Sequence, residues 1–305
     1  MLAGMRGLYG VAWGMEFSCF SQPEDCPGAG FCILPLIFCT FVLFFLFPGY
    51  KLLSYHTIDT DFQKNRKAGE RYMRYLMSDI HGDFENFYKM LVKINFSNYD
   101  QLYVLGDVLD KGTENLCLYE FIYHTENIYL LKGNHEYLCE RYLSGQITAE
   151  MWDSCGGETT RREVSVLSEE KRQALYYSLR ELPIYKVLQT GSTQYFLTHS
   201  GYHADCCVRD PESGLVDIEA SVKKAVSWNQ ERYLFSDDIH YIPASLRFDK
   251  RLIVGHYPTL LLPDFRRAEI YHGTKYTNLD TGNERRDQGG RLACLRLEDG
   301  REFYV

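Results

Sequence analysis

Five short segments of this sequence end an apolar, strand-like run with side chains that can bind metal ions or transfer protons. In chain order they read "SDIHGD", "GDVLDKG", "GNHE", "THSG" and "GHYP". In the first three, Asp79, Asp107 and Asn134 follow one another at intervals of 28 and 27 residues, which is the length of a strand–helix unit. The last two contain His199 and His256. Taken alone, each segment is equally typical of a polar loop. Their repetition indicates one shared site.

These segments are expected to meet at one edge of a sheet. In open α/β sheets, ligands bind outside the carboxyl ends of the strands. Carboxylates and imidazoles crowded there would repel and desolvate one another unless a cation lay between them. Aspartate, histidine and asparagine without a thiolate suit Mn, Fe or Zn better than a structural cysteine–zinc site. Two metal ions need a shared ligand, and Asp107, on the central strand, is best placed to bridge them.

The spacing of apolar residues predicts the elements that position these segments. Strands are expected at 72–77, 101–105 and 127–131, and amphipathic helices at 84–94 and 114–124. This βαβαβ order favours parallel strands joined by right-handed crossovers. A helix is expected at 169–182, followed by β-like runs at 184–188, 194–198, 251–254, 269–271, 276–279, 292–297 and 302–305. We therefore expect one α/β domain over residues 73–305, with a parallel first half and a more antiparallel second half.

The ordered set of motifs resembles the calcineurin-like metallophosphoesterases. The motifs are GDxHG, GDxxD[RK]G, GNH[ED], HxG and GHxP, joined here by "WDSCGGETT" and by the later segments "NLDTG" and "GGRLACLRLEDG". The resemblance covers residues 73–305 and is strongest to bacterial members of the phosphoprotein phosphatase family, which also include symmetrical dinucleoside tetraphosphatases. It implies a four-layer αββα sandwich of two mixed sheets flanked by helices. It also implies two divalent metal ions, with Mn²⁺ expected and Fe or Zn as alternatives.

The resemblance also implies roles for individual residues. Six would be metal ligands: Asp79 and His81 for one ion, Asp107 as the bridge, and Asn134, His199 and His256 for the other. A metal-bridging hydroxide would attack phosphorus in line. His135 would then protonate the leaving oxygen, and Asp110 would orient His135 by accepting a hydrogen bond from its other ring nitrogen.

Two departures from the family pattern concern phosphate binding. The residue after Asp110 is usually arginine, but here it is Lys111. Lysine supplies charge without a bidentate geometry, so weaker phosphate binding is expected, not inactivity. At a second phosphate contact, relatives carry Trp-x-Arg, whereas this chain has Gln230 there and Arg232 two residues later. Arg232 is therefore a candidate phosphate ligand, with an ordinary surface charge as the alternative.

These features lead to three functional hypotheses. The first is a serine/threonine protein phosphatase, and the second is a hydrolase of dinucleoside polyphosphates or of another small phosphorylated molecule. The third is an inactive phosphatase-like module that binds phosphorylated partners. The net charge of −8 argues against passive nucleic-acid binding. The expected partner is a phosphorylated protein or a small phosphoester.

The first 72 residues have a different composition from the rest of the chain. Residues 31–47 carry no charge, and their length is at the short limit of a membrane-spanning helix. Basic residues follow this segment, so a genuine anchor would place the catalytic domain in the cytoplasm. The alternatives are an over-extended reading frame with translation starting at Met73, and a soluble hydrophobic arm. The ten cysteines form no CxxC pair, which suits a cytoplasmic location.

Overall fold

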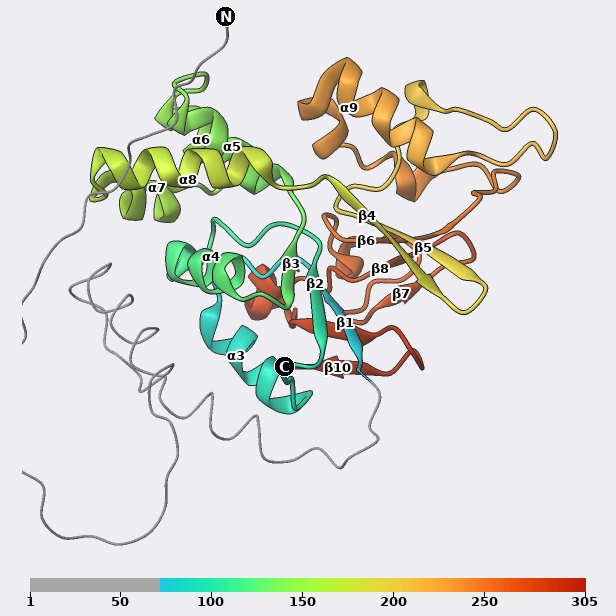
Figure 1. Cartoon of the computed structure of the whole chain (residues 1–305), viewed down its shortest axis with the longest axis horizontal. Helices are drawn as coiled ribbons and strands as arrows, with labels where there is room; N and C mark the ends of the chain where they lie inside the picture. The colour runs from blue at the N-terminus through green and yellow to red at the C-terminus, as the bar shows by residue number, and fades with distance from the viewer. Residues whose placement is uncertain (1–71) are drawn as a thin grey trace, which may run out of the picture. The chain divides into compact units, whose positions relative to one another are not determined.

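The computed structural model describes residues 72–305, and two five-stranded sheets form the centre of this part of the chain (Figure 1). The expected leader at residues 1–72, with its apolar segment 31–47, lies outside the described residues except for Tyr72. No helix within residues 72–305 has the length and the apolar character needed to cross a membrane.

The first sheet has the strand order β10-β9-β1-β2-β3. Its strands are β1 (Arg74–Met77), β2 (Gln101–Val104), β3 (Ile128–Leu130), β9 (Ala293–Arg296) and β10 (Glu302–Tyr304). The pairs β1–β2 and β2–β3 are parallel, whereas β9 is antiparallel to both β1 and β10. The helices that connect the parallel strands are α3 (Phe84–Lys93) and α4 (Asn115–His124). The predicted βαβαβ unit is confirmed, with boundaries that differ by no more than two residues.

The second sheet contains both parallel and antiparallel pairs. Its order is β4-β5-β6-β8-β7, with strands β4 (Tyr185–Thr190), β5 (Thr193–Thr198), β6 (Arg251–Val254), β7 (Tyr271–His272) and β8 (Tyr276–Asn278). β4 and β5 form the predicted hairpin, but β5–β6 and β6–β8 are parallel pairs. The second half is nevertheless more antiparallel than the first, as expected, since β4–β5, β7–β8 and β9–β10 are antiparallel pairs. The crossover helix between β5 and β6, α9 (Ile218–Leu234), was not predicted.

The two faces of the second sheet pack against different layers. Leu197 and Ile253 belong to the same apolar cluster as Leu76 and Tyr103, so this face packs against the first sheet. Their neighbours Phe196 and Leu252 point the other way and pack with residues of α9, including Val222 and Tyr233. Alternation along each strand thus separates the two clusters. On the other side of the molecule, α3 contacts β10 and α4 contacts β3, which completes the predicted four layers.

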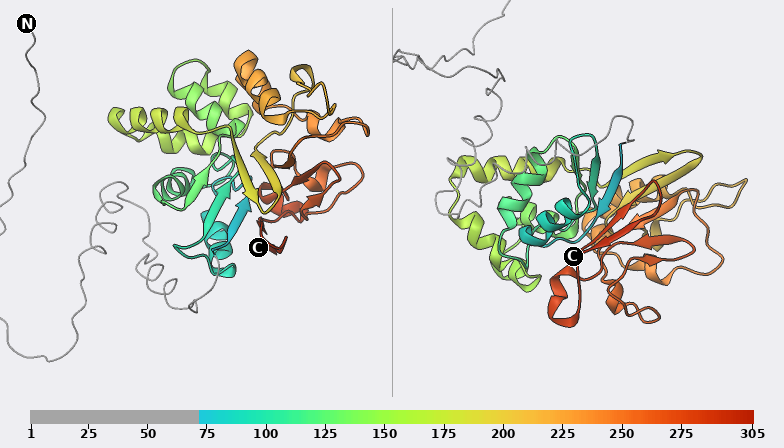
Figure 2. Two further views of the ribbon diagram at one scale, coloured as in Figure 1. Left: turned by 45° about the vertical axis from the view of Figure 1, so that its right-hand side comes forward. Right: turned by 90° about the horizontal axis from the view of Figure 1, so that it is seen from below.

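Four further helices gather beside the first sheet, as the labels in Figure 1 and the two views in Figure 2 show. They are α5 (Asn134–Leu143), α6 (Ala149–Ser154), α7 (Glu158–Ser165) and α8 (Glu169–Glu181), the last in the predicted place. Side-chain oxygens of Thr148 and Ser168 cap α6 and α8. Short 3₁₀ helices occupy Ala204–Cys206, Asp238–Tyr241, Thr259–Leu261 and Asn283–Gln288. Since α5 follows β3 directly, its first turn lies at the carboxyl edge of the first sheet.

Candidate active site

The first three predicted segments lie side by side at the carboxyl ends of β1, β2 and β3. The backbone N–H of Asp79 donates to the carbonyl of Gly106 at 3.1 Å, and that of His81 donates to the carbonyl of Asp107 at 3.0 Å. These bonds continue the parallel pairing of β1 with β2 past the ends of the strands. The loop that carries Asp79 and His81 is therefore fixed relative to the loop that carries Asp107.

The predicted site residues hold unusual backbone conformations. Among residues 72–305, eight residues other than glycine have a positive φ. Six of them are predicted site residues: Asp79, His81, Asp107, Asp110, Lys111 and His256. The left-handed region costs a side-chain-bearing residue roughly 1–2 kcal/mol. Such strain concentrates at functional sites, where the surrounding contacts hold it in place.

One group of potential ligands contains Asp107, His199 and His256. One ligand atom from each of the three lies within 4.8 Å of the others. The Oδ1 of Asn134 lies 2.8 Å from His199 Nε2 and 2.9 Å from His256 Nδ1, so this amide oxygen belongs to the same cluster. The Oδ2 of Asp107 is 3.3 Å from His199 Nε2. The structure thus brings together the four residues predicted to share the second metal ion.

A second group contains His81, Asp107 and His135, again with ligand atoms within 4.8 Å of one another. Asp107 belongs to both groups, which is the arrangement expected of a bridging ligand. Asp79 lies beside them, since its Oδ2 accepts hydrogen bonds from the Ser78 hydroxyl and from the backbone N–H of His256 at 3.0 Å. A Cβ added to Gly255 would lie 2.3 Å from Asp79 Oδ2, so only glycine allows this close approach.

The histidine side chains are oriented as metal ligands require. His81 Nδ1 lies 3.0 Å from the carbonyl of Leu109, and His199 Nδ1 lies 2.7 Å from the carbonyl of Leu105. A carbonyl only accepts hydrogen bonds, so each Nδ1 carries the proton and each Nε2 faces the site. A backbone carbonyl on the outer nitrogen is the common partner of a metal-bound histidine. The donor set and its orientation therefore fit two divalent cations.

Burial and neighbouring charges shift the pKa values of these groups. Burial would lower the pKa of His199, but the carboxylate of Asp107 raises this pKa to about 9. Burial and the adjacent His199 lower the pKa of His256 to about 3. Burial also raises the pKa of Asp79 to about 7. A site that holds a proton on His199 without metal must release it when a cation binds, so metal affinity should rise with pH.

His135 and Asp110 form the predicted pair. His135 Nδ1 donates to Asp110 Oδ2 at 2.7 Å, and both side chains are buried. His135 Nε2 faces Asp107 Oδ2 at 3.8 Å. Burial would lower the pKa of His135, but the carboxylates of Asp107 and Asp110 raise it above the ordinary value. The arrangement keeps a proton on His135 and directs its second nitrogen into the site.

Glu136, which the sequence analysis did not single out, links two of the loops. Its buried carboxylate accepts hydrogen bonds from four backbone N–H groups, those of Asp107 (2.8 Å), Val108 (2.9 Å), Leu109 (3.2 Å) and Gly133 (2.9 Å). The only signal in the sequence was its position next to His135 in "GNHE". Glu136 therefore fixes the bridging Asp107 relative to the first turn of α5.

Replacing Glu136 with alanine should destabilise the protein strongly. The change leaves four buried N–H groups without their acceptor, and each unsatisfied group costs about 1–3 kcal/mol before relaxation. We expect a loss of about 4 kcal/mol in the free energy of unfolding and a Tm lower by roughly 10 °C, measured by calorimetry. Glu120→Gln, a surface change on α4, is the control and should leave the Tm unchanged within about 2 °C. An equal Tm for Glu136→Ala and the wild type would contradict this role.

The two candidate phosphate ligands have different surroundings. The ammonium of Lys111 lies 3.0 Å from His81 Nε2, so its side chain reaches into the site. Arg232 lies on the exposed side of α9, where it pairs with Asp205 at 3.2 Å and stacks on the ring of Trp228 at 4.9 Å. The structure therefore brings Lys111 to the ligand groups, whereas a phosphate contact of Arg232 stays a prediction.

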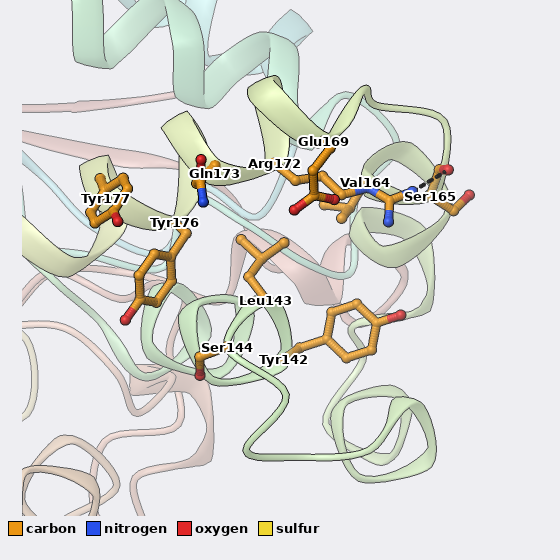
Figure 3. Close-up of a pocket in the computed structure, with 10 residues that line it drawn as sticks. All are labelled: Tyr142, Leu143, Ser144, Val164, Ser165, Glu169, Arg172, Gln173, Tyr176 and Tyr177. Carbon is orange, nitrogen blue, oxygen red and sulfur yellow. Dashed lines mark hydrogen bonds between the residues drawn. The ribbon is translucent and has the colours of Figure 1, made fainter.

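A pocket of about 470 Å³ lies away from these residues, between α5, α7 and α8 (Figure 3). It is lined by side chains such as Tyr142, Arg172 and Tyr176. Its lining includes none of the predicted ligands, so we do not place the reaction there. Tyr142 packs its ring 4.9 Å from that of Trp152. Trp152 in turn contacts Asp110, a contact that no sequence pattern indicated.

Comparisons with known proteins agree with the fold and with the family that the motifs resemble. A family model described as calcineurin-like phosphoesterase matches residues 75–285. The chain is 30% identical to the symmetrical bis(5'-nucleosyl)-tetraphosphatase of Haemophilus ducreyi, over 42% of this chain and 44% of that protein. It is 25% identical to the asymmetrical bis(5'-nucleosyl)-tetraphosphatase PrpE of Halalkalibacterium halodurans, over 73% of this chain and 89% of that protein.

The solved structures support the same architecture. A crystal structure assigned to a diadenosine tetraphosphatase superposes with a TM-score of 0.50 at 15% identity, covering 78% of this chain and 94% of that one. At this identity the likeness concerns the fold alone. The family match spans both ligand groups and the His135–Asp110 pair. This chain belongs to the calcineurin-like phosphoesterases and is a metallophosphoesterase.

Proposed function

We propose that the chain is a dinuclear-metal-dependent phosphohydrolase in which His135 is the general acid. The observation that carries this proposal is the buried His135–Asp110 hydrogen bond of 2.7 Å beside two ligand groups that share Asp107. We assign one metal ion to Asp79, His81 and Asp107, and the other to Asp107, Asn134, His199 and His256. Mn²⁺ is the proposed ion, with Fe and Zn as alternatives.

Each of the proposed site residues has a separate role in the reaction. Two divalent cations held here would supply an activated water for attack on phosphorus and neutralise charge on the phosphoryl oxygens. Lys111 adds a positive charge on the side of His81, where it can bind a phosphoryl oxygen. His135 holds a proton on the nitrogen that faces the site and donates it to the leaving oxygen. Asp110 keeps the imidazole in the required tautomer. Arg232 is the proposed second phosphate contact.

Two substrate classes are supported by different observations. The names of the relatives describe hydrolases of bis(5'-nucleosyl) tetraphosphates, which supports a dinucleoside polyphosphate as the substrate. The buried His135–Asp110 pair supports phosphoserine or phosphothreonine in proteins. The alkoxide released from these esters is strongly basic and needs a proton, whereas a leaving nucleotide phosphate has a pKa near 6 and needs it much less.

The substrate class can be tested with the metal-loaded protein. The values of kcat/KM are compared for diadenosine tetraphosphate, a phosphoserine peptide and phenyl phosphate. A preference of at least tenfold for the nucleotide would select the first class, and the reverse would select the second. Hydrolysis of none of them above the rate of an Asp107→Asn variant would favour the third hypothesis, an inactive phosphate-binding module.

Lys111→Arg should bind phosphate more tightly than the wild type. A guanidinium can donate two parallel hydrogen bonds to phosphate, where an ammonium acts as a point charge. We expect the inhibition constant of inorganic phosphate to fall by about fivefold, which corresponds to ~1 kcal/mol. Lys89→Arg is the matched control, because Lys89 lies on the exposed face of α3 and pairs with Glu85. Unchanged or weaker inhibition in Lys111→Arg would show that Lys111 does not contact phosphate.

A further inference from the structure

The indole of Trp152 contacts the carboxylate that holds the proposed general acid. Trp152 Nε1 donates to Asp110 Oδ2 at 2.8 Å, and the same oxygen accepts the 2.7 Å hydrogen bond from His135 Nδ1. Trp152 is fully buried, in α6. The other oxygen of Asp110, Oδ1, is buried and has no hydrogen-bond partner among residues 72–305. Both contacts that orient this carboxylate therefore act on one oxygen.

The neighbours of Trp152 hold it in this position. A Cβ added to Gly157 would lie 2.2 Å from Trp152 Cδ1, so the indole lies directly against the backbone of the following turn. The ring also packs against Tyr142, with the two centroids 4.9 Å apart. A buried indole that contacts both a glycine backbone and an aromatic ring has little freedom to turn. Packing thus helps to set the direction of its N–H.

The same segment also holds the backbone on which Asp110 lies. The hydroxyl of Thr160 accepts a hydrogen bond from the backbone N–H of Asp110 at 2.9 Å, and the carbonyl of Gly156 accepts one from the N–H of Lys111 at 3.0 Å. Asp110 and Lys111 have φ values of 71° and 66°, a left-handed pair that needs such external contacts to persist. Residues 152–160 therefore fix both the backbone and the carboxylate of Asp110.

We propose that Trp152 is a positioning residue for proton donation by His135. An indole N–H only donates and does not titrate, so it keeps Oδ2 of Asp110 turned toward His135 in every protonation state of the pair. Without this donor, the carboxylate retains one tether and can rotate about its terminal bond. His135 then loses the partner that fixes its ring and its tautomer. This inference rests on the proposed role of His135 as the general acid.

The leaving group of the substrate separates this role from a general loss of structure. Phenyl phosphate releases a basic oxygen and depends on the acid, whereas 2,4-dinitrophenyl phosphate releases a weakly basic one and does not. With the metal-loaded full chain, Trp152→Phe should lower kcat for phenyl phosphate by about tenfold, the effect of one charge-assisted hydrogen bond. The kcat for the dinitrophenyl ester should change less than about twofold. The ratio of the two rates does not depend on the fraction of folded protein.

Two further variants and one direct measurement complete the test. Trp152→His retains a ring N–H, so its ratio of kcat for phenyl phosphate to kcat for the dinitrophenyl ester should be higher than that of Trp152→Phe. Tyr142→Phe keeps the ring that packs on the indole and should leave this ratio at the wild-type value. In ¹⁵N-labelled protein the indole N–H of Trp152 should exchange slowly with solvent, and Asp110→Ala, which removes the acceptor, should speed this exchange. Double substitution of Trp152 and Asp110 should lower the ratio no further than Asp110→Ala alone.

The outcomes that overturn the inference are distinct from those that overturn the proposed function. Equal losses with both esters in Trp152→Phe would show a purely structural role, and no loss with either would show no role. Indole exchange that is unaffected in Asp110→Ala would also refute the contact. If His135→Asn shows no selective loss with phenyl phosphate, the general-acid proposal itself fails, whatever Trp152→Phe shows.

Discussion

Asp107→Asn is expected to lower metal-dependent turnover by at least about a thousandfold. Asp107 is the one residue that belongs to both ligand groups, and its side chain also accepts the backbone N–H of His135 at 3.1 Å. Asparagine has nearly the same shape but provides one ligand oxygen instead of two and no negative charge. Both ions should therefore bind more weakly. Metal content by mass spectrometry and kcat for phenyl phosphate are the two measurements.

The control for this substitution is Asp299→Asn. Asp299 lies on the exposed turn between β9 and β10, where it pairs with Arg296. Its replacement removes one negative charge from the chain without touching either ligand group, so metal content and kcat should match those of the wild type. If Asp107→Asn hydrolyses phenyl phosphate as fast as the wild type, the two-metal reading of the site is wrong.

His135→Asn should lower kcat for esters with basic leaving groups by about a hundred- to ten-thousandfold, the usual contribution of a general acid. Asparagine can still donate a hydrogen bond to Asp110 but has no proton to transfer. The metal content should stay the same, since the proposed ligands of both ions remain in place. The kcat for 2,4-dinitrophenyl phosphate should fall much less.

Metal content decides between two roles of His135. One nitrogen of His135 lies within 4.8 Å of ligand atoms of His81 and Asp107, so His135 could hold a metal ion itself. Loss of one equivalent of metal from His135→Asn would show that it is a ligand and would remove the acid role. His272→Asn is the matched control, because His272 is half-exposed and pairs with Glu302 at the edge of the second sheet.

The convergence of the site could be predicted because its residues follow strands. Asp79, Asp107 and Asn134 each lie just past one strand of a βαβαβ unit, and parallel strands end at the same edge. The apolar spacing located these strands to within two residues. His199 and His256 were placed by the same reasoning, and the parallel pairing of β5 with β6 brings the ends of their two strands to the same edge. Position after a strand was therefore the information that located the site.

The contacts that support the site could not be predicted from the sequence. Trp152 is 42 residues from Asp110, and Glu136 is 27 residues from Leu109. Such contacts depend on how helices pack against loops, which local periodicity does not record. The helix α9 was also not predicted. Its residue Asn229 has a non-helical backbone, and this interrupts the apolar spacing of the helix.

The left-handed backbone at six site residues has a consequence for protein engineering. Glycine adopts this conformation without the penalty that a side chain brings, so a change to glycine at a strained position can raise stability by about 1 kcal/mol. At Asp79, His81, Asp107, Asp110, Lys111 and His256 the same change would delete a proposed ligand, positioning group or phosphate contact. A screen that selected only for heat resistance would therefore tend to accumulate inactive variants at these positions. Selection for stability in this protein should include an activity filter.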